Sequence, residues 1–192
     1  TVSLVMPYVP NARMDRVKNP FREVHTLKYF AAFINSLNFK YVYILDPHSS
    51  AASDFIDRVV IWESDNIIKQ ILSGQFGDKF DYIYFPDKGA YERYGSIVTT
   101  HPIIFGEKDR DWVTGQIKGL NVHFVIPDTR PLPLVGMNVL MVDDISSYGG
   151  TFKFGAMKLR ELGAQKVSLF VTHCEKNIFA DKGVLTTHPD LI

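Results

Sequence analysis

The chain has 192 residues, and its 21 Lys and Arg balance its 21 Asp and Glu, so the formal net charge is zero. This balance excludes a general electrostatic attraction to nucleic acid, and any anionic ligand must be held by local groups. A single cysteine excludes an internal disulfide. No apolar run is long enough to span a bilayer, so we expect a soluble cytoplasmic protein that does not bind membranes.

Apolar strand-like runs alternate along the chain with segments of helical period. Strands are expected at residues 2–8, 41–46, 81–87, 101–108, 121–128, 138–144 and 166–173. Helices are expected at residues 24–37, 64–75, 88–98 and 151–163, and a polar hairpin or mobile loop at residues 109–120. Strands rich in branched residues that alternate with helices predict an α/β fold with mainly parallel sheets flanked by helices.

Two further features concern the organisation of the chain. Residues 37–48 and 162–173 each run from a helix end through a strand to a histidine, which favours a duplicated α/β domain joined near residues 57–64, although chance similarity remains open. The chain also starts directly on a strand-like run and stops without a closing helix or polar tail. Because natural termini are usually exposed, we expect a piece of a longer protein, with a compact variant as the alternative.

The segment VLMVDDISSYGGTF, residues 139–152, carries the clearest chemical signal. Asp143 and Asp144 follow a buried strand, and ligands of α/β sheets gather at such strand ends. Two adjacent carboxylates repel each other, so we expect Mg²⁺, a basic residue or ribose hydroxyls to compensate them. The small turn at residues 147–151 opens a helix whose N–H groups could cradle a phosphate. A plain turn with an acidic helix start fits the spacing equally well.

This segment resembles the phosphoribosyl pyrophosphate (PRPP) binding motif of type I phosphoribosyltransferases, in which two acids precede a loop that ends in glycine and threonine. Other segments narrow the resemblance to the ribose-phosphate diphosphokinase (PRPP synthetase) family, and they follow that family's order. They are MPYVPNARMDR (6–16), REVHTLKYFAAFIN (22–35), ILDPHS (44–49), FPDKGA (85–90), EKDR (107–110) and VTHC (171–174). The resemblance therefore covers nearly the whole chain.

The resemblance implies two phosphoribosyltransferase-like halves. Residues 1–60 would be the C-terminal part of the first domain, and residues 61–192 the second domain with the ribose-phosphate loop. It also implies a transferase of nucleotide biosynthesis that moves the pyrophosphoryl group of ATP to ribose 5-phosphate, giving PRPP and AMP, with Mg²⁺ as cofactor. The family further implies a homo-oligomer.

The resemblance implies that ATP is bound by Arg13, Asp15, Arg16 and His48. The residue types suit this task, because guanidinium groups hold phosphates bidentately. Without the family, a surface salt bridge between the arginines and Asp15 would be the commoner explanation, and His48 would be a surface or capping residue.

His48, Lys108 and Arg110 would be the catalytic residues, and His48 and Asp87 the metal ligands. Phosphoryl transfer depends on positioning and charge neutralisation, which such cations supply. Lys108 and Arg110 are two residues apart and would share one side of an extended strand. A solvated charge cluster on a hairpin is the alternative for this pair, and a helix N-cap is the alternative for Asp87.

The resemblance assigns ribose 5-phosphate binding to the two acids, the turn and one earlier aspartate. These residues are Asp87, Asp143, Asp144, Ser147, Tyr148, Gly149, Gly150 and Thr151. The sequence departs from the family at Ser147 and Tyr148, where acid and threonine are usual, and at Met14, where glutamine is usual. The departures at Ser147 and Tyr148 favour one alternative, a non-catalytic subunit associated with PRPP synthetase. A second alternative is a phosphoribosyltransferase that consumes PRPP, and the segments at residues 6–16 and 44–49 argue against it.

Overall fold

The computed structural model describes residues 2–17, 19, 21–75, 79–98, 100–110, 117–125 and 134–191, with the backbone alone at residues 108–110, 117 and 118. The chain divides into two compact units, Thr1–Ser64 (unit 1) and Asp65–Ile192 (unit 2). The boundary expected after residue 60 therefore falls inside a strand of unit 1. Across the described stretches, no helix has the length and apolarity needed to cross a bilayer.

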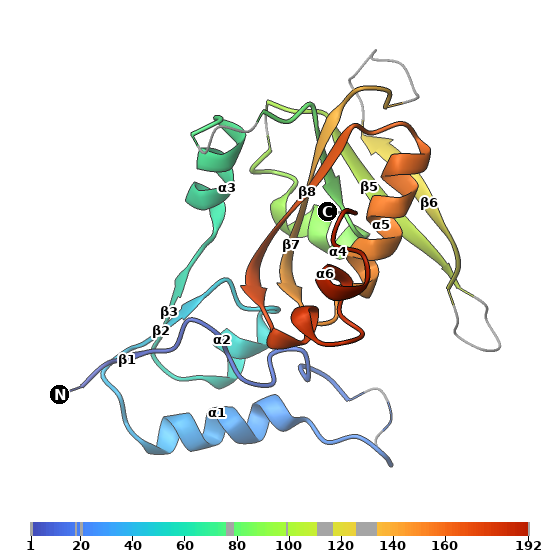
Figure 1. The fold of residues 1–192 in the computed structure, drawn as a ribbon. Helices are drawn as coiled ribbons and strands as arrows, with labels where there is room; N and C mark the ends of the chain where they lie inside the picture. The colour runs from blue at the N-terminus through green and yellow to red at the C-terminus, as the bar shows by residue number, and fades with distance from the viewer. Residues whose placement is uncertain are drawn as a thin grey trace. The chain divides into compact units, whose positions relative to one another are not determined.

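In its described residues, unit 1 consists of three parallel strands and two helices (Figure 1). They are β1 (Leu4–Val5), α1 (Thr26–Ser36), β2 (Val42–Leu45), α2 (Ala51–Phe55) and β3 (Val59–Trp62). The strands pair in the order β1-β2-β3. Alternate residues of β2, Val42 and Ile44, are buried in one core with Leu27 of α1 and Ala52 of α2. Both helices therefore pack on the same face of the sheet.

Unit 2 contains a five-stranded sheet in the order β6-β5-β4-β7-β8. Its described elements are α3 (Asp65–Leu72), β4 (Tyr82–Phe85), α4 (Lys88–Tyr94), β5 (Ile103–Arg110), β6 (Ile117–Val125), β7 (Asn138–Ser146), α5 (Gly150–Glu161), β8 (Lys166–Cys174), the 3₁₀ helix η1 (Lys176–Phe179) and α6 (Val184–Thr187). All neighbouring strands are parallel except β5 and β6. The expected α/β class with mainly parallel sheets is confirmed.

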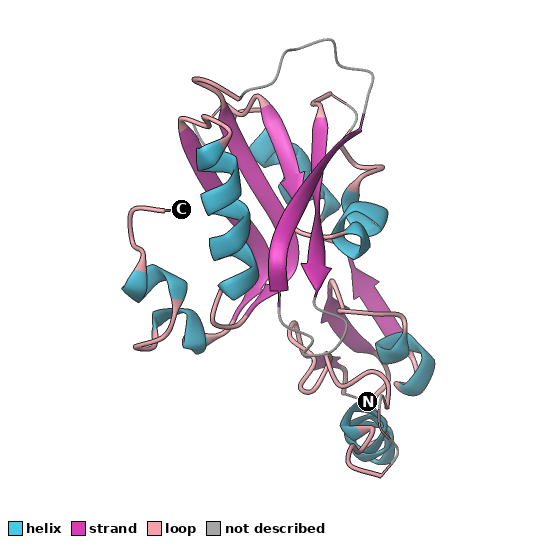
Figure 2. Cartoon of the chain, turned by 90° about the vertical axis from the view of Figure 1, so that its right-hand side faces the viewer, coloured by secondary structure: helices cyan, strands magenta, loops and turns pink. Residues whose placement is uncertain are grey.

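Helices cover both faces of this sheet, as Figures 1 and 2 show. On one face, Phe152 and Leu159 of α5 are buried with Met141 of β7. On the other face, Ile68 of α3 and residues of α4 are buried with Val142 of β7. Because β7 is covered on both sides, its apolar run is continuous rather than alternating, as expected for a central parallel strand.

Residues 109–120 were expected to form a polar hairpin or a mobile loop, and in the described residues the hairpin is confirmed, because β5 and β6 pair antiparallel. β5 continues through Arg110 and β6 begins at Ile117, while residues 111–116 lie outside the described part of the chain. Lys108 pairs with Leu120 and Asp109 with Gly119 in an antiparallel ladder. This pairing satisfies the backbone groups of a polar sequence, so strand structure forms where side-chain polarity alone favours a loop.

The faint sequence repeat corresponds to the same backbone turn in both units. α1 and α5 each end in a leucine C-cap with right-handed helical angles, Leu37 and Leu162. Each leucine is followed by a left-handed residue, Asn38 (φ 53°) or Gly163 (φ 97°), before the next strand. Asparagine and glycine are the residues that tolerate this conformation, so the two turns reverse the chain by one mechanism.

Candidate functional site

The acid pair lies at the carboxyl end of β7, where successive side chains point to opposite faces of the sheet. Asp144 is 5% exposed, and its Oδ2 accepts a hydrogen bond from Arg93 Nη1 of α4 at 3.2 Å. The basic residue expected beside the acids is therefore present for Asp144. Sequence reasoning did not find Arg93, because 51 residues separate the partners and no local pattern connects them.

Asp143 has a different environment. Burial, and then the negative charge of Asp144, raise the pKa of Asp143 from 3.8 to about 8, and Asp87 adds a smaller effect in the same direction. The backbone N–H of Asp144 donates to Asp143 Oδ1 at 2.9 Å and opposes this rise. Among the described residues, no basic side chain contributes to lowering this pKa. Asp143 is thus a partly buried acid that a ligand with hydroxyl donors or positive charge would stabilise.

The turn after β7 is held by the segment that follows β8. The backbone N–H groups of Glu175 and Val184 donate to the carbonyls of Ser146 and Tyr148 at 2.8 and 2.9 Å. Asn177 Nδ2 donates to Ser147 Oγ at 3.1 Å. Sequence reasoning missed these contacts as well, because η1 and α6 carry no apolar period that marks them.

Gly149 and Gly150 bring the turn into α5. Gly149 is the N-cap residue in a left-handed conformation, with φ of 81°, and Gly150 is the first helical residue. Glycine offers no side chain to the first N–H groups of the helix, so these donors remain for an anion. The ring of Tyr148, which the sequence places in this turn, is 49% exposed, and Thr151 lies in the first turn of α5.

Asp87 is the N-cap residue of α4, and its Oδ1 accepts a hydrogen bond from the backbone N–H of Ala90 at 3.1 Å. The capping role considered from the sequence is therefore present. Its charge also reaches neighbouring groups, since it raises the pKa of Asp143, and burial together with Asp87 raises the pKa of Tyr84. A role of Asp87 in ligand binding stays a prediction.

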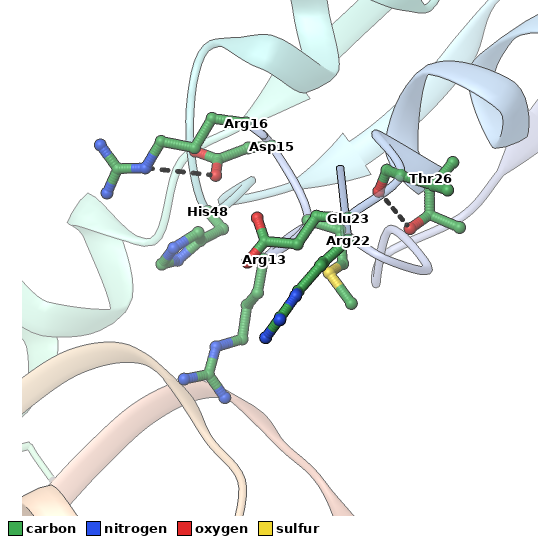
Figure 3. Close-up of a pocket in the computed structure, with 9 residues that line it drawn as sticks. Arg13, Asp15, Arg16, Arg22, Glu23, Thr26 and His48 are labelled. Atoms are coloured by element: carbon green, nitrogen blue, oxygen red, sulfur yellow. Dashed lines mark hydrogen bonds and ion pairs between the residues drawn. The ribbon is translucent and has the colours of Figure 1, made fainter. Parts of the chain in front are cut away.

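A second site is a pocket of about 480 Å³ in unit 1. Its lining residues are Arg13, Met14, Asp15, Arg16, Arg22, Glu23, Val24, Thr26 and His48. In Figure 3 the side chains of Arg13 and Arg22 extend in the same direction, and Arg16 Nε lies 3.9 Å from Asp15 Oδ1. Every ATP-binding residue expected from the sequence lines this pocket. Arg22 is an additional cation in this pocket, and from the sequence it was only the first residue of the segment 22–35.

His48 reaches the pocket because of how β2 ends. Asp46 directly follows the strand with a positive φ of 41°, and it is 1% exposed. Its Oδ2 accepts a hydrogen bond from Ser64 Oγ at 2.7 Å, and its N–H donates to the carbonyl of Trp62 at 2.8 Å. This buried anchor holds an unfavourable backbone conformation two residues before His48.

The remaining predicted residues are less fully described. Lys108 and Arg110 lie in β5, but their side chains lie outside the described residues. His48 belongs to unit 1 and Asp87 to unit 2. Within the described stretches, no group of three or more His, Cys, Asp or Glu side chains forms a ready-made metal site.

Replacing Arg93 by methionine is expected to lower the free energy of unfolding by about 1–3 kcal/mol, because Asp144 would stay buried without its partner. The range is discounted because the Arg93 side chain is 27% exposed. Urea unfolding at pH 7 measures the effect. Lys88→Met is the matched control, since it removes an exposed ion pair with Glu92 and should change stability by less than about 0.5 kcal/mol. Equal losses in the two variants would contradict the structural role of Arg93.

Comparison with known proteins shows which fold the chain has. The phosphoribosylpyrophosphate synthetase from Mycobacterium smegmatis matches with a TM-score of 0.69 at 21% identity, over 94% of this chain and 58% of that one. The chain therefore has the fold of a PRPP synthetase. The sequence is also similar to those of curated relatives. The ribose-phosphate pyrophosphokinases of Pyrococcus furiosus and Thermococcus kodakarensis are 30% and 28% identical to this chain.

Each of these two alignments covers 95% of this chain and 61% of the relative, so the chain spans about three fifths of the length of these relatives. No family model matches the chain. The resemblance to ribose-phosphate pyrophosphokinases expected from the motifs is confirmed along nearly the whole chain.

Proposed function

We propose that this chain supplies the two substrate sites of a ribose-phosphate diphosphokinase, which transfers the pyrophosphoryl group of ATP to ribose 5-phosphate. The observation that carries the proposal is the pocket of unit 1, where separate segments bring three arginines and a histidine around one cavity. The two relatives, both ribose-phosphate pyrophosphokinases, support the same reaction. We further propose a cytoplasmic homo-oligomer, on the strength of the resemblance alone.

In this proposal the pocket binds the phosphates of ATP. The lining contains three arginines, at positions 13, 16 and 22, and two acidic residues, Asp15 and Glu23. It therefore has a surplus of positive charge. Guanidinium groups form paired hydrogen bonds to phosphate oxygens, which fixes the orientation as well as the position of the nucleotide. His48 adds a hydrogen-bonding group at the end of β2.

The sugar phosphate would bind at the turn of unit 2. The N–H groups at the start of α5 suit its phosphate, and the carboxyl groups at the end of β7 suit its ring hydroxyls. Hydroxyl groups that donate to Asp143 would favour its ionised form and lower its pKa again. The Arg93 contact holds the carboxylate of Asp144 in place.

The donor set is compatible with Mg²⁺. This ion prefers oxygen ligands and is commonly held by one or two carboxylates together with substrate phosphates, so a complete protein cage is not required. Asp87 carries negative charge that such an ion would neutralise, and the charge of the ion would favour the ionised form of Asp143. His48 and Asp87 stay the proposed contacts of the ion. When bound, Mg²⁺ would neutralise phosphate charge during transfer.

Pyrophosphoryl transfer requires stabilisation of the phosphate charge and does not require a covalent intermediate with the protein. The anomeric hydroxyl oxygen of ribose 5-phosphate forms a bond to the β-phosphorus of ATP and gives up its proton to solvent. The bond from that phosphorus to the oxygen bridging the α-phosphate breaks, which releases AMP. Lys108 and Arg110 of β5 would neutralise the transferring group, while the pocket arginines hold the remaining phosphates.

The test is an assay of the full-length protein with ATP, ribose 5-phosphate and Mg²⁺, in which AMP and PRPP are followed. We expect both products in equal amounts, and at least a hundredfold loss of rate in His48→Ala and Lys108→Ala, because each removes a group at the transferring phosphates. Lys176→Ala, an exposed residue of η1, is the control and should keep its rate.

Two other outcomes would point to other functions. Consumption of PRPP on addition of a nucleobase, without AMP formation, would indicate a phosphoribosyltransferase. Silence in both assays, together with binding to an active PRPP synthetase, would indicate a non-catalytic subunit. The neutral Ser147, in place of an acid that could hold ribose hydroxyls, is the feature that favours this second alternative.

A further inference from the structure

Ser147 has a hydrogen-bonding partner that the sequence does not indicate. Asn177 lies in η1, beyond β8, and its Nδ2 donates to Ser147 Oγ at 3.1 Å, with both side chains partly buried. Ser147 also stands at a position where the PRPP synthetase family usually has an acidic residue. The contact therefore shows what this chain does with a neutral residue in the turn.

The polarity of the contact decides what Ser147 can offer a ligand. A serine hydroxyl has one O–H donor and two lone pairs, whereas an ionised carboxylate only accepts. When Oγ accepts from the amide of Asn177, the O–H group is left to donate elsewhere. A partner that accepted from Ser147 would instead consume that donor.

The position of Asn177 is set by the same scaffold that holds the turn. On one side of it, the N–H of Glu175 donates to the carbonyl of Ser146 at 2.8 Å. On the other side, the N–H of Val184 donates to the carbonyl of Tyr148 at 2.9 Å. Ile178, the next residue after Asn177, is 2% exposed and anchors η1. Asn177 is thus fixed relative to Ser147 by backbone contacts on both sides.

We propose that Asn177 is a positioning residue: its amide orients the Ser147 hydroxyl as a hydrogen-bond donor to the phosphate group of the bound sugar phosphate. The inference rests on the proposed function and deepens it, because it assigns the turn a neutral donor in place of a charged acceptor. Ser147 then acts with the N–H groups at the start of α5, which also donate, and the phosphate meets donors from a side chain and from the backbone.

Isothermal titration of the full-length protein with ribose 5-phosphate tests the proposal. Ser147→Ala removes the donor and should weaken binding about tenfold or more, as expected for a hydrogen bond to a charged group. Ser147→Thr keeps the hydroxyl and should bind within about threefold of the wild type. Asn177→Asp, which is isosteric, accepts the Ser147 proton instead and should weaken binding about as much as Ser147→Ala.

The double variant separates positioning from a direct charge effect. If Asn177 acts through the serine, Asn177→Asp should weaken binding by less than about threefold in the Ser147→Ala background. A full loss in that background would mean that the new carboxylate repels the ligand directly, and this would overturn the proposal. Urea unfolding of each variant checks that the fold is intact.

Inorganic phosphate, used as a competitor of ribose 5-phosphate, identifies the group that Ser147 contacts. Ser147→Ala should weaken both ligands by the same factor. Weaker binding of the sugar phosphate with unchanged competition by phosphate would mean that Ser147 meets the sugar, and would overturn the proposal while leaving the proposed function intact. A wild-type protein that bound no ribose 5-phosphate would overturn the proposed function, and this inference with it.

Discussion

Asp143→Asn is expected to stabilise the protein at pH 8 and above, while weakening its binding of ribose 5-phosphate by about tenfold or more. The folded state raises the pKa of Asp143 from 3.8 to about 8, through burial first and the charge of Asp144 second. An amide of the same shape carries no charge at any pH. It therefore removes both the burial cost of the carboxylate and its repulsion by Asp144.

The sign of the pH dependence follows from proton linkage. Between about pH 4 and pH 8 the folded protein retains a proton on Asp143 that the unfolded chain has released. The unfolded state then binds fewer protons, so the free energy of unfolding falls as pH rises through this window and levels off above it. The expected contribution is on the order of 2 kcal/mol or more.

Urea unfolding midpoints from pH 5 to pH 9 measure this contribution. The wild type should lose stability across the window, and Asp143→Asn should lose clearly less. Asp181→Asn, at an exposed aspartate, is the control and should follow the wild-type slope. Parallel curves for wild type and Asp143→Asn would contradict the partly buried, uncompensated state of Asp143. A carboxylate that opposes folding near neutral pH is typical of a binding site rather than of a helix start.

The parts of the fold that could be predicted are those whose signal is local. β7 and α5 span 9 and 12 residues, and the apolar run at residues 139–142 and the helical period of α5 are clear local patterns. α2 and β3 span only 5 and 4 residues and were missed, because so short a segment shows no clear period. The ends of β5 and β6 lie in the segment expected as a polar hairpin or mobile loop, and the extent of these strands was not predicted because backbone pairing overrides a polar composition.

The same distinction applies to the candidate site. Arg13, Asp15, Arg16 and His48 were expected from motifs, and they line one pocket. Arg93 and Asn177 were not expected, because their partners lie 51 and 30 residues away along the chain. Contacts over such separations depend on the strand order of the sheet and the path of the chain after β8. A single sequence does not encode them in a readable pattern.

Gly149→Ala is expected to lower the free energy of unfolding by about 2–4 kcal/mol and to weaken ribose 5-phosphate binding by more than about tenfold. Gly149 has a φ of 81°, a left-handed conformation that costs about 1–2 kcal/mol for a residue with a Cβ atom. The added Cβ would also overlap Cγ1 of Val184 in α6. Since α6 holds the turn through the carbonyl of Tyr148, the backbone donors of the turn would move with it.

The neighbouring glycine provides the matched control. A Cβ added at Gly150 would meet open space, and this residue begins α5. Gly150→Ala should therefore leave stability within about 0.5 kcal/mol of the wild type or raise it slightly, because alanine favours a helix and restricts the unfolded chain. Equal losses in the two alanine variants would contradict this account of the turn.

The two costs at Gly149 can be separated by making room in α6. In Gly149→Ala with Val184→Ala, the overlap with Cγ1 is removed, while Cβ of residue 184 stays close to the added Cβ, at 3.0 Å, and the left-handed backbone remains strained. Only part of the loss should therefore be recovered relative to Val184→Ala alone. Ligand binding discriminates further. If the turn holds the phosphate through its backbone, the double variant should still bind ribose 5-phosphate weakly, even where its fold is as stable as that of Val184→Ala, because the N–H donors are set by the φ angle at Gly149 and not by the space around it.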